Sequence, residues 1–182
     1  MVTELLLTPN IYSRPQRQII PEGIALHWVE NPGQSALAVR NYFEMRKEGK
    51  LGYGSAPYIV DEDAIIRDIP EWEMAYHVGA NSYTDYGLER YGPYPNARLL
   101  GVEYCHPDWS GKPSPKTWIN LVELFCDICI RHNYNPDLDI TTHYAITGKV
   151  TPRGPCPKWF VEHPSDLIIF KNQVKECMQE KI

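Results

Sequence analysis

One stretch of the chain, residues 141–160, gathers several side chains that could do chemistry. It reads T-T-H-Y-A-I-T-G-K-V-T-P-R-G-P-C-P-K-W-F and contains His143, Lys149, Thr151 and Cys156. Imidazole and thiolate groups are ligands that zinc prefers, and an ammonium group can donate to a developing negative charge. The glycines and prolines predict a loop, so these groups would converge through turns.

Two further candidates lie in apolar segments that are typical of buried strands. His27 is in G-I-A-L-H-W-V, residues 23–29, where a period of two places it on the face opposite the large apolar side chains. Glu103 is the only charge in L-L-G-V-E-Y-C, and burying an ionised carboxylate there is costly unless a cation pairs with it. If both strands belong to one sheet, His27 and Glu103 meet on one face, near the loop of residues 141–160.

Together these side chains fit a hydrolytic zinc site. Zinc is bound tetrahedrally, and a catalytic site uses three protein ligands and leaves the fourth position to water. His27, His143 and Cys156 would leave one net positive charge to acidify that water and polarise a carbonyl. Glu103 would take the proton of the water and return it to the leaving nitrogen, while Lys149 would donate to the oxyanion.

The apolar pattern predicts the elements that must position these groups. Strands and helices interleave, which predicts an α/β fold in which helices flank a central mixed β-sheet. We expect one domain over residues 1–182, with its core at about 20–178. The expected strands are 23–29, 57–61, 64–70 and 97–105, of which the middle two form a hairpin. The expected helices are 34–50, capped by Ser35, 115–132, capped by Ser114, and a last one from Ser165.

Composition narrows the classes of function. The chain has 182 residues, of which 43% are hydrophobic, and this suffices for one good core. No apolar run is long enough to span a bilayer, so we expect no membrane insertion. A net charge of -5 disfavours nucleic acid as a partner. Five scattered cysteines predict thiols or metal ligands rather than a disulfide framework, and Cys126 and Cys129 are interpreted as core residues of a helix.

Several segments, in this order, resemble the zinc-dependent N-acetylmuramoyl-L-alanine amidase family, which includes phage endolysins and peptidoglycan recognition proteins. They are A-L-H-W-V, S-A-P-Y-I-V-D with I-I-R-D-I-P, A-Y-H-V-G, L-L-G-V-E-Y-C and T-H-Y-A-I-T-G-K. The match covers roughly residues 20–175, which is far more than one short motif. The resemblance implies that His27 and His143 bind zinc, that Glu103 is the general base and acid, and that Lys149 stabilises the transition state.

The chain departs from the family pattern at two places. Many relatives have a histidine where this chain has Pro57. Members with a T-G-K loop usually place a cysteine where this chain has Thr151, whereas here Cys156 follows only after an apparent insertion, T-P-R-G-P. Because a threonine hydroxyl stays neutral and a thiolate binds zinc at ~2.3 Å, we expect Cys156 to be the third ligand.

The resemblance implies an activity and a setting. The reaction would be hydrolysis of the amide between N-acetylmuramic acid and L-alanine in bacterial peptidoglycan, with Zn²⁺ as cofactor and the cell wall as partner. We expect a lytic role, as a phage endolysin or an autolysin. The first residues, M-V-T-E-L-L-L-T-P-N, lack the features of a signal peptide, so we expect synthesis in a host cytoplasm and action on the wall after release.

Aromatic residues are candidate substrate contacts. The run N-S-Y-T-D-Y-G-L-E-R-Y-G-P-Y-P-N, residues 81–96, carries four tyrosines, and sugar rings and peptide stems pack well on aromatic faces. We expect Tyr58, Tyr83 and Tyr86 to contact the substrate, together with His77, which the resemblance places beside the groove. The alternative is a loop that is folded on itself by its own tyrosines.

Three other interpretations are open at this point. Glu103 would be half of a structural ion pair if Lys149 or Arg98 were its partner. The chain would be a non-catalytic wall-binding module if it had kept the groove and lost the metal, although the presence of Cys156 and Glu103 argues against this. It would be a cysteine hydrolase if Cys156 were activated by His143 or by a helix N-terminus.

Overall fold

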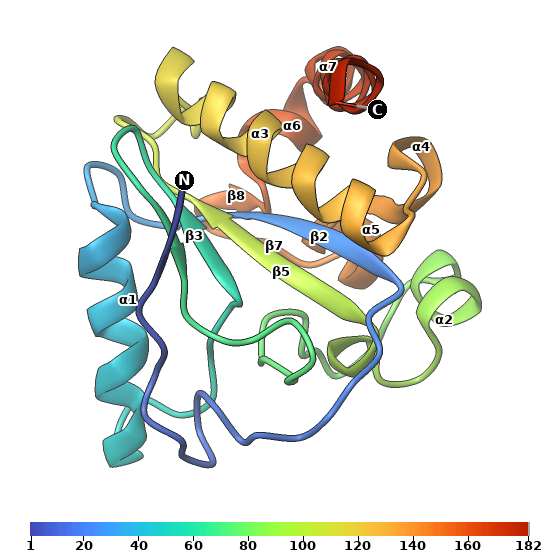
Figure 1. The fold of residues 1–182 in the computed structure, drawn as a ribbon. Helices are drawn as coiled ribbons and strands as arrows, with labels where there is room; N and C mark the ends of the chain where they lie inside the picture. Colours follow the sequence, from blue (N-terminus) through green and yellow to red (C-terminus); the bar gives the residue numbers. More distant parts are fainter. Residues whose placement is uncertain (182) are drawn as a thin grey trace.

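A six-stranded sheet forms the centre of the protein (Figure 1). The structure is a computed structural model that describes residues 1–181. The strand order is β1–β4–β3–β5–β2–β6, in which β3 and β4 are antiparallel and the other neighbours are parallel. The expected mixed sheet is therefore confirmed. Its strands are Val2–Glu4 (β1), Gly23–Trp28 (β2), Tyr58–Val60 (β3), Ile65–Arg67 (β4), Leu99–Tyr104 (β5) and Ile140–Thr142 (β6).

The central strands β2 and β5 carry their large apolar side chains on one face. These are Ile24, Leu26, Trp28, Leu100, Val102 and Tyr104, all buried in the largest core cluster. Successive strand residues point to opposite faces, so Ala25 and His27 point the other way. The predicted separation of His27 from the large apolar residues is thus confirmed by the core that forms on the opposite face.

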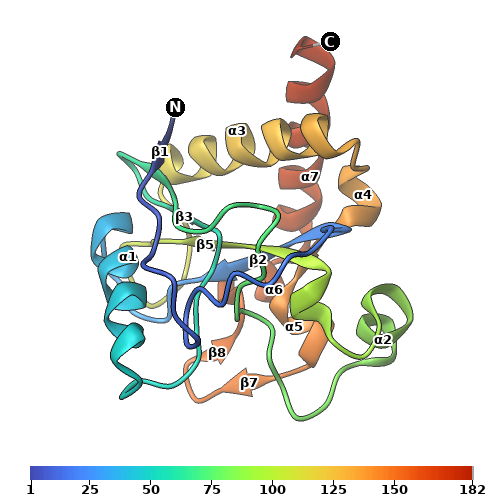
Figure 2. The same cartoon turned by 60° about the horizontal axis from the view of Figure 1, so that its bottom comes forward.

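Helices cover both faces of the sheet. The apolar face of β2 and β5 packs against α3 (Pro115–His132), α6 (Lys158–Glu162) and α7 (Pro164–Lys181). On the other face lie α1 (Ala36–Met45), followed by a short turn η1 (Arg46–Glu48), and the smaller helices α2 (Asp85–Tyr91) and α5 (His143–Thr147). Figure 2 shows the sheet between these two groups. The remaining short helices are the 3₁₀ helix η2 (Pro95–Ala97) and the α-helix α4 (Pro136–Asp139).

The helix boundaries follow from local capping chemistry. The side chains of Ser35 and Ser114 accept hydrogen bonds from the backbone N–H groups of Ala38 and Thr117, as predicted for N-caps. Helix α3 begins at Pro115. Proline has no backbone N–H, and at the first position of a helix this group would have no partner within the helix. These caps explain why the boundaries of α1 and α3 could be read from the sequence.

Two segments predicted as loops contain regular structure. Residues 81–96 hold α2, whose N-cap Thr84 accepts a hydrogen bond from the N–H of Gly87, and the start of η2. Residues 141–160 hold α5 and a two-stranded hairpin, β7 (Val150–Thr151) and β8 (Gly154–Pro155). Glycine and proline inside or beside such short elements resemble loop signals, which is why the sequence did not reveal them. In addition, β1 extends the sheet to residues before the expected core.

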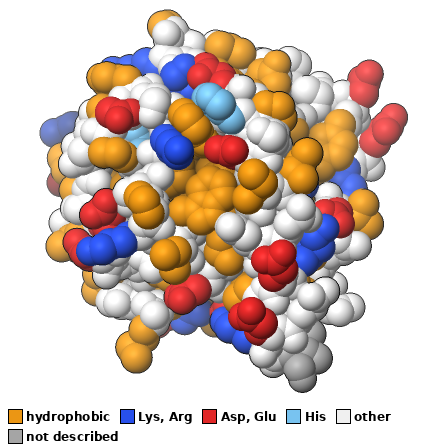
Figure 3. All heavy atoms as spheres, turned by 90° about the horizontal axis from the view of Figure 1, so that it is seen from above, with side chains coloured by type: hydrophobic (Ala, Val, Ile, Leu, Met, Phe, Trp, Pro, Cys, Tyr) orange, Lys and Arg blue, Asp and Glu red, His pale blue; other side chains and the backbone are white. Residues whose placement is uncertain are grey.

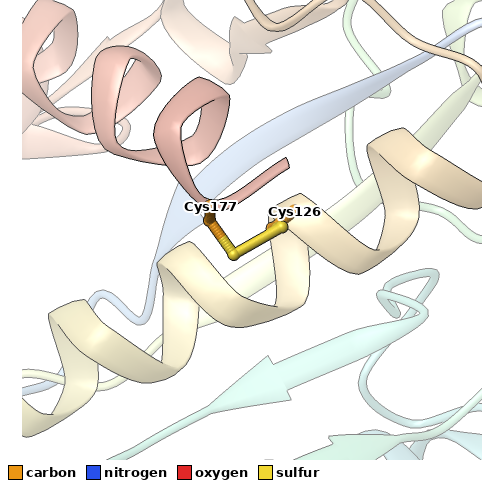
Figure 4. The surroundings of a disulfide bond; sticks show 2 residues. All are labelled: Cys126 and Cys177. Atoms are coloured by element: carbon orange, nitrogen blue, oxygen red, sulfur yellow. A yellow bond between two sulfur atoms is a disulfide. The ribbon is translucent and has the colours of Figure 1, made fainter. Parts of the chain in front are cut away.

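The cysteines are not all thiols. Cys126 of α3 and Cys177 of α7 form a disulfide that joins the two helices, with their Cα atoms 6.1 Å apart (Figure 4). The prediction of free thiols or metal ligands is therefore wrong for this pair, because spacing along the chain does not reveal which helices pack together. Cys129 is buried and free, and both Cys126 and Cys129 belong to the core, as interpreted from the sequence.

The surface mixes apolar and charged side chains. On the face shown in Figure 3, a group of hydrophobic side chains near the centre is interrupted by acidic and basic ones. Exposed large hydrophobic residues include Ile119 of α3 and Ile168 of α7. Along residues 1–181, neither of the long helices nor any shorter one combines the length and the apolar character that crossing a bilayer requires.

Asp68 is an unusual feature of the core beside β4. Its side chain is fully buried, and neither carboxylate oxygen has a hydrogen-bond partner among the described residues. Burial raises the pKa of Asp68 to about 8, although Arg40 opposes this shift and Glu44 adds to it. The folded protein therefore holds a proton that the unfolded chain releases between about pH 4 and pH 8.

We therefore expect Asp68 to lower stability as the pH rises. Its favourable contribution is fully present below the unfolded pKa and is lost as the pH approaches the folded pKa of about 8. Asp68→Asn should match the wild type near pH 4 and exceed it by a few kcal/mol in the free energy of unfolding near pH 8. Denaturant titrations across this range, with exposed Asp63→Asn as the control, would measure the difference. Parallel pH profiles for Asp68→Asn and wild type would contradict the expectation.

Candidate functional site

The candidate residues converge at the carboxyl ends of three neighbouring parallel strands. His27 of β2 and Glu103 of β5 are partners in the parallel register, so both side chains point to the same face. On the other side of β2, strand β6 ends at Thr142 and His143 begins α5. Ligands of α/β proteins commonly bind at this edge of a sheet, because several chain segments leave it there together.

His27, His143 and Cys156 form a group that could hold one metal ion. One ligand atom from each lies within 4.8 Å of the others, and Sγ of Cys156 is 3.6 Å from Nδ1 of His27. Two atoms bound tetrahedrally at the usual Zn–S and Zn–N lengths would be about 3.5 Å apart. Nε2 of His143 is buried with no hydrogen-bond partner within residues 1–181. A zinc ion would satisfy this nitrogen, and the donor set is one that zinc prefers.

The hairpin after α5 brings Cys156 back to the histidines. Gly148 ends α5 with a positive φ of 65°, a conformation that glycine adopts without strain, and turns the chain toward Lys149. Strands β7 and β8 then reverse the chain, and the N–H of Tyr144 donates to the carbonyl of Cys156 over 2.8 Å. The apparent insertion is therefore a defined turn that returns to α5.

Burial controls the protonation of the three candidate ligands. It lowers the pKa of His27 well below its ordinary value, and nearby His143 and His77 add to the effect. Burial, with a smaller contribution from Lys149, lowers the pKa of His143 to about 4. For Cys156, burial and then the carboxylate of Glu103 raise the thiol pKa well above its usual range. Both imidazoles are thus neutral, which is the metal-binding form, and a metal must displace the thiol proton.

His77 determines which ring nitrogen of His27 carries the proton. Its Nε2 lies 3.0 Å from the carbonyl of Leu99, which can only accept, so this nitrogen carries the proton. Burial lowers the pKa of His77 to about 4, so the ring is neutral and its Nδ1 is an acceptor. Nδ1 is 3.0 Å from Nε2 of His27, which must therefore donate. The remaining Nδ1 of His27 is left with its lone pair on the side of Cys156.

Gly101 makes room for His77 in the sheet. A Cβ atom at Gly101 would lie 2.7 Å from Cγ of His77, which is closer than real side chains approach. Asn96 holds the other side of the residue, because its side-chain oxygen accepts from the N–H groups of His77 and Val78. The glycine in L-L-G-V-E-Y-C is therefore required by this close approach.

A pocket of about 250 Å³ opens over the candidate ligands. Glu103 and Lys149 both line it, together with His27, His143 and Cys156. Burial, and secondly the charge of Glu30, raise the pKa of Glu103 to about 8. No ion pair involving Glu103 or Lys149 occurs within residues 1–181, and the other suggested partner, Arg98, pairs with Glu22. The structural ion pair considered from the sequence is therefore absent from the described part of the chain.

The aromatic candidates are only partly brought to this region. Tyr83 lines a neighbouring cavity of about 700 Å³ whose wall also includes Tyr53, Tyr76 and Tyr94. Tyr86 is exposed and packs edge-on against Tyr91, within its own segment. Tyr58 is a correction: it is 1% exposed and its hydroxyl donates to Glu71 over 2.7 Å, on the apolar side of the sheet. Its strand pairing, opposite Val102, turns it away from Glu103.

His77 lies beside the groove as expected, because it lines the pocket of the candidate ligands. It is 8% exposed and contacts His27, and its contact with substrate stays a prediction. Sequence reasoning missed Tyr76, which lines both cavities, and Glu30, which lines the pocket beside Glu103. Tyr76 adjoins His77 in A-Y-H-V-G and Glu30 follows the strand of His27, so proximity to the motifs was the available signal.

The chain is similar in sequence to characterised families of proteins. The chain is 33% identical over 173 residues to a probable N-acetylmuramoyl-L-alanine amidase of Bacillus licheniformis, covering 94% of this chain and 46% of that protein. It is 30% identical over 190 residues to the N-acetylmuramoyl-L-alanine amidase BlyA of Bacillus subtilis strain 168, covering 98% and 48%. The chain thus spans about half the length of the curated relatives it matches.

Solved structures share the fold. The catalytic domain of PlyG superposes with a TM-score of 0.75 at 20% identity, covering 98% of this chain and 95% of that one. PlyL gives a TM-score of 0.74 at 22% identity, covering 96% of each chain. The profile described as N-acetylmuramoyl-L-alanine amidase (Amidase_2) matches residues 15–158, which include the two histidines, Glu103 and the cysteine of the site. The chain belongs to the N-acetylmuramoyl-L-alanine amidase family.

Proposed function

We propose that this chain hydrolyses the amide bond between N-acetylmuramic acid and L-alanine in bacterial peptidoglycan, with zinc as its cofactor. The observation that carries the proposal is the group of His27, His143 and Cys156, which lines one pocket together with Glu103. Family membership and the names of the curated relatives support the bond and the substrate. A lytic role, as a phage endolysin or an autolysin reaching the wall after release, is part of the same proposal.

Each residue of the pocket has a separate role in the proposed reaction. A zinc ion held by His27, His143 and Cys156 would supply a Lewis acid that acidifies water and polarises the scissile carbonyl. The charge of that ion would lower the pKa of Glu103, whose carboxylate would then accept the proton of the attacking water and return it to the leaving nitrogen. Lys149 stands at the pocket with no carboxylate partner in the described residues, so its ammonium is free to donate to the developing oxyanion.

The two alternative functions have less support. A thiolate nucleophile needs a lowered pKa, whereas burial raises the pKa of the Cys156 thiol well above its usual range. The close histidine contact of Cys156 is with His27, at 3.6 Å, rather than with the suggested partner His143. A wall-binding module without chemistry would have no need of three converging ligands and a buried Glu103.

The first prediction from the proposed function concerns the metal and the bond. The purified protein should hold about one zinc ion, and a strong chelator should abolish wall digestion until zinc is restored. Digestion should release new amino groups of L-alanine and no new reducing sugar ends, because the reaction cuts an amide. Metal analysis and mass spectrometry of the products measure both. Activity in a metal-free preparation, or reducing ends without amines, would contradict the proposal.

The second prediction separates binding of the metal from chemistry. Glu103→Gln preserves shape but cannot take a proton, so activity should fall by ~10²-fold or more while zinc content stays at the wild-type level. Lys149→Gln should also lose activity and retain zinc, since the lysine acts on the oxyanion. The matched control is Lys116→Gln on the exposed surface of α3, which should be fully active. Normal turnover by Glu103→Gln would remove this residue from the mechanism.

The third prediction concerns His77 as a positioning residue. His77→Leu removes the acceptor for Nε2 of His27 and should weaken zinc binding by ~10- to 100-fold. Gly101→Ala should act in the same direction, because the added methyl group would displace the ring of His77. The control is Gly79→Ala, where a Cβ meets its nearest neighbour at an ordinary 3.7 Å. Competition with a coloured chelator measures the affinities, and unchanged zinc binding in both variants would show that His77 only fills space.

A further inference from the structure

Glu30 is a pocket residue to which the proposed reaction gives no role. It follows β2 and lies half-buried, where it lines the pocket of the candidate ligands. It also lines an adjacent cavity of about 620 Å³ that extends toward α1. Glu30 stands outside the group of potential metal ligands, so it requires another explanation.

Two hydrogen bonds join Glu30 to the turn of the β7–β8 hairpin. The hydroxyl of Thr151 donates to the side-chain carboxylate of Glu30. The guanidinium of Arg153 donates to the backbone carbonyl of Glu30 over 2.5 Å, and it also lies over the ring of Trp109 at 5.0 Å. One residue just beyond β2 thus holds the hairpin through both its side chain and its backbone.

The β7–β8 hairpin is too short for its internal contacts alone to fix its conformation and position. Each strand has two residues, and isolated hairpins, even much longer ones, are only marginally stable in water. Its internal side-chain bonds are few: Thr151 Oγ1 accepts from the N–H of Arg153 at 3.2 Å and contacts the carbonyl of Gly154 at 3.3 Å. External contacts must therefore decide where the hairpin lies.

The position of the hairpin matters because functional groups flank it. Lys149 immediately precedes β7, and Cys156 immediately follows β8. The N–H of Tyr144 holds the carbonyl of Cys156 on one side, at 2.8 Å. The bonds at Glu30 anchor the opposite part of the same turn.

We propose that Glu30 is a positioning residue of the metal centre, which anchors the hairpin through Thr151 and so holds the sulfur of Cys156 against His27. This inference rests on the proposed role of Cys156 as a zinc ligand. It also assigns a role to Thr151, whose hydroxyl holds the hairpin to the segment that follows β2.

The test compares zinc affinities of the full chain by competition with a coloured chelator. Glu30→Ala removes the acceptor of the bond and Thr151→Val removes its donor. Each should weaken zinc binding by ~10-fold or more, which is the typical effect of mutating a residue that holds a metal ligand in place. The double variant should be no weaker than the more affected single variant, because both changes remove the same bond. Glu30→Gln retains an oxygen acceptor for Thr151 and should stay close to wild type. Exposed Glu89→Ala on α2 is the control.

A cobalt-substituted sample supplies a second readout. The sulfur-to-cobalt absorption band should weaken in Glu30→Ala and persist in Glu30→Gln, since only the first frees the cysteine. Wild-type affinity in both Glu30→Ala and Thr151→Val would overturn the inference, as would additive losses in the double variant. Equal damage by Glu30→Gln and Glu30→Ala would mean that Glu30 acts through its charge, and would also overturn it. If Glu30→Ala fails to fold, Thr151→Val and Glu30→Gln still decide.

The outcomes distinguish this inference from the proposed function. No peptidoglycan is used, so the measurement depends only on the metal centre. A wild-type chain that binds no zinc would contradict the proposed function itself. A wild-type chain that binds zinc, with variants that bind it equally well, would contradict only the role of Glu30.

Discussion

The parallel pairing of β2 with β5 is the constraint on which the site depends. It sets His27 beside Glu103, and the same register sets Leu26 beside Val102 on the opposite face. A shift of one strand by a single residue would turn its polar side chain into the apolar core under α3, where a polar group without a hydrogen-bond partner is costly. The apolar packing on one side of the sheet therefore stabilises the arrangement of polar groups on the other.

The polar side of the sheet is ordered by hydrogen bonds that leave few alternatives. The carbonyl of Leu99 fixes the proton of His77, and His77 in turn fixes that of His27. Each link is buried, where an unmade hydrogen bond costs more than in water. Gly101 is as important as these hydrogen-bonding groups. Because it has no side chain, the ring of His77 can lie next to the backbone of β5. Geometry and protonation of the site are thus set by the same contacts.

Features that depend on local chemistry could be predicted from the sequence, whereas features that depend on distant partners could not. Ser35, Ser114 and Pro115 allowed the starts of their helices to be predicted. The hydrogen bond that an N-cap side chain accepts comes from a backbone N–H within the first turn, so it depends only on nearby residues. His27 and Glu103 could be paired because strand periodicity fixes their faces. Tyr58 was misplaced because its motif gave no information about which face its short strand would bury. The bond between Cys126 and Cys177, and the anchor between Glu30 and Thr151, join segments whose proximity only the folded chain creates.

The disulfide between α3 and α7 has a topological consequence. It closes a covalent loop across a separation of 51 residues, and that loop contains His143 and Cys156 but leaves His27 outside. On a chain-entropy account, such a closure restricts the unfolded ensemble by about 4 kcal/mol. In the zinc-bound state that we propose, the ion ties the loop to a strand outside it and acts as a second cross-link. Each cross-link would stabilise the folded protein, which would resist unfolding most when the Cys126–Cys177 bond is formed and zinc is held by the reduced Cys156.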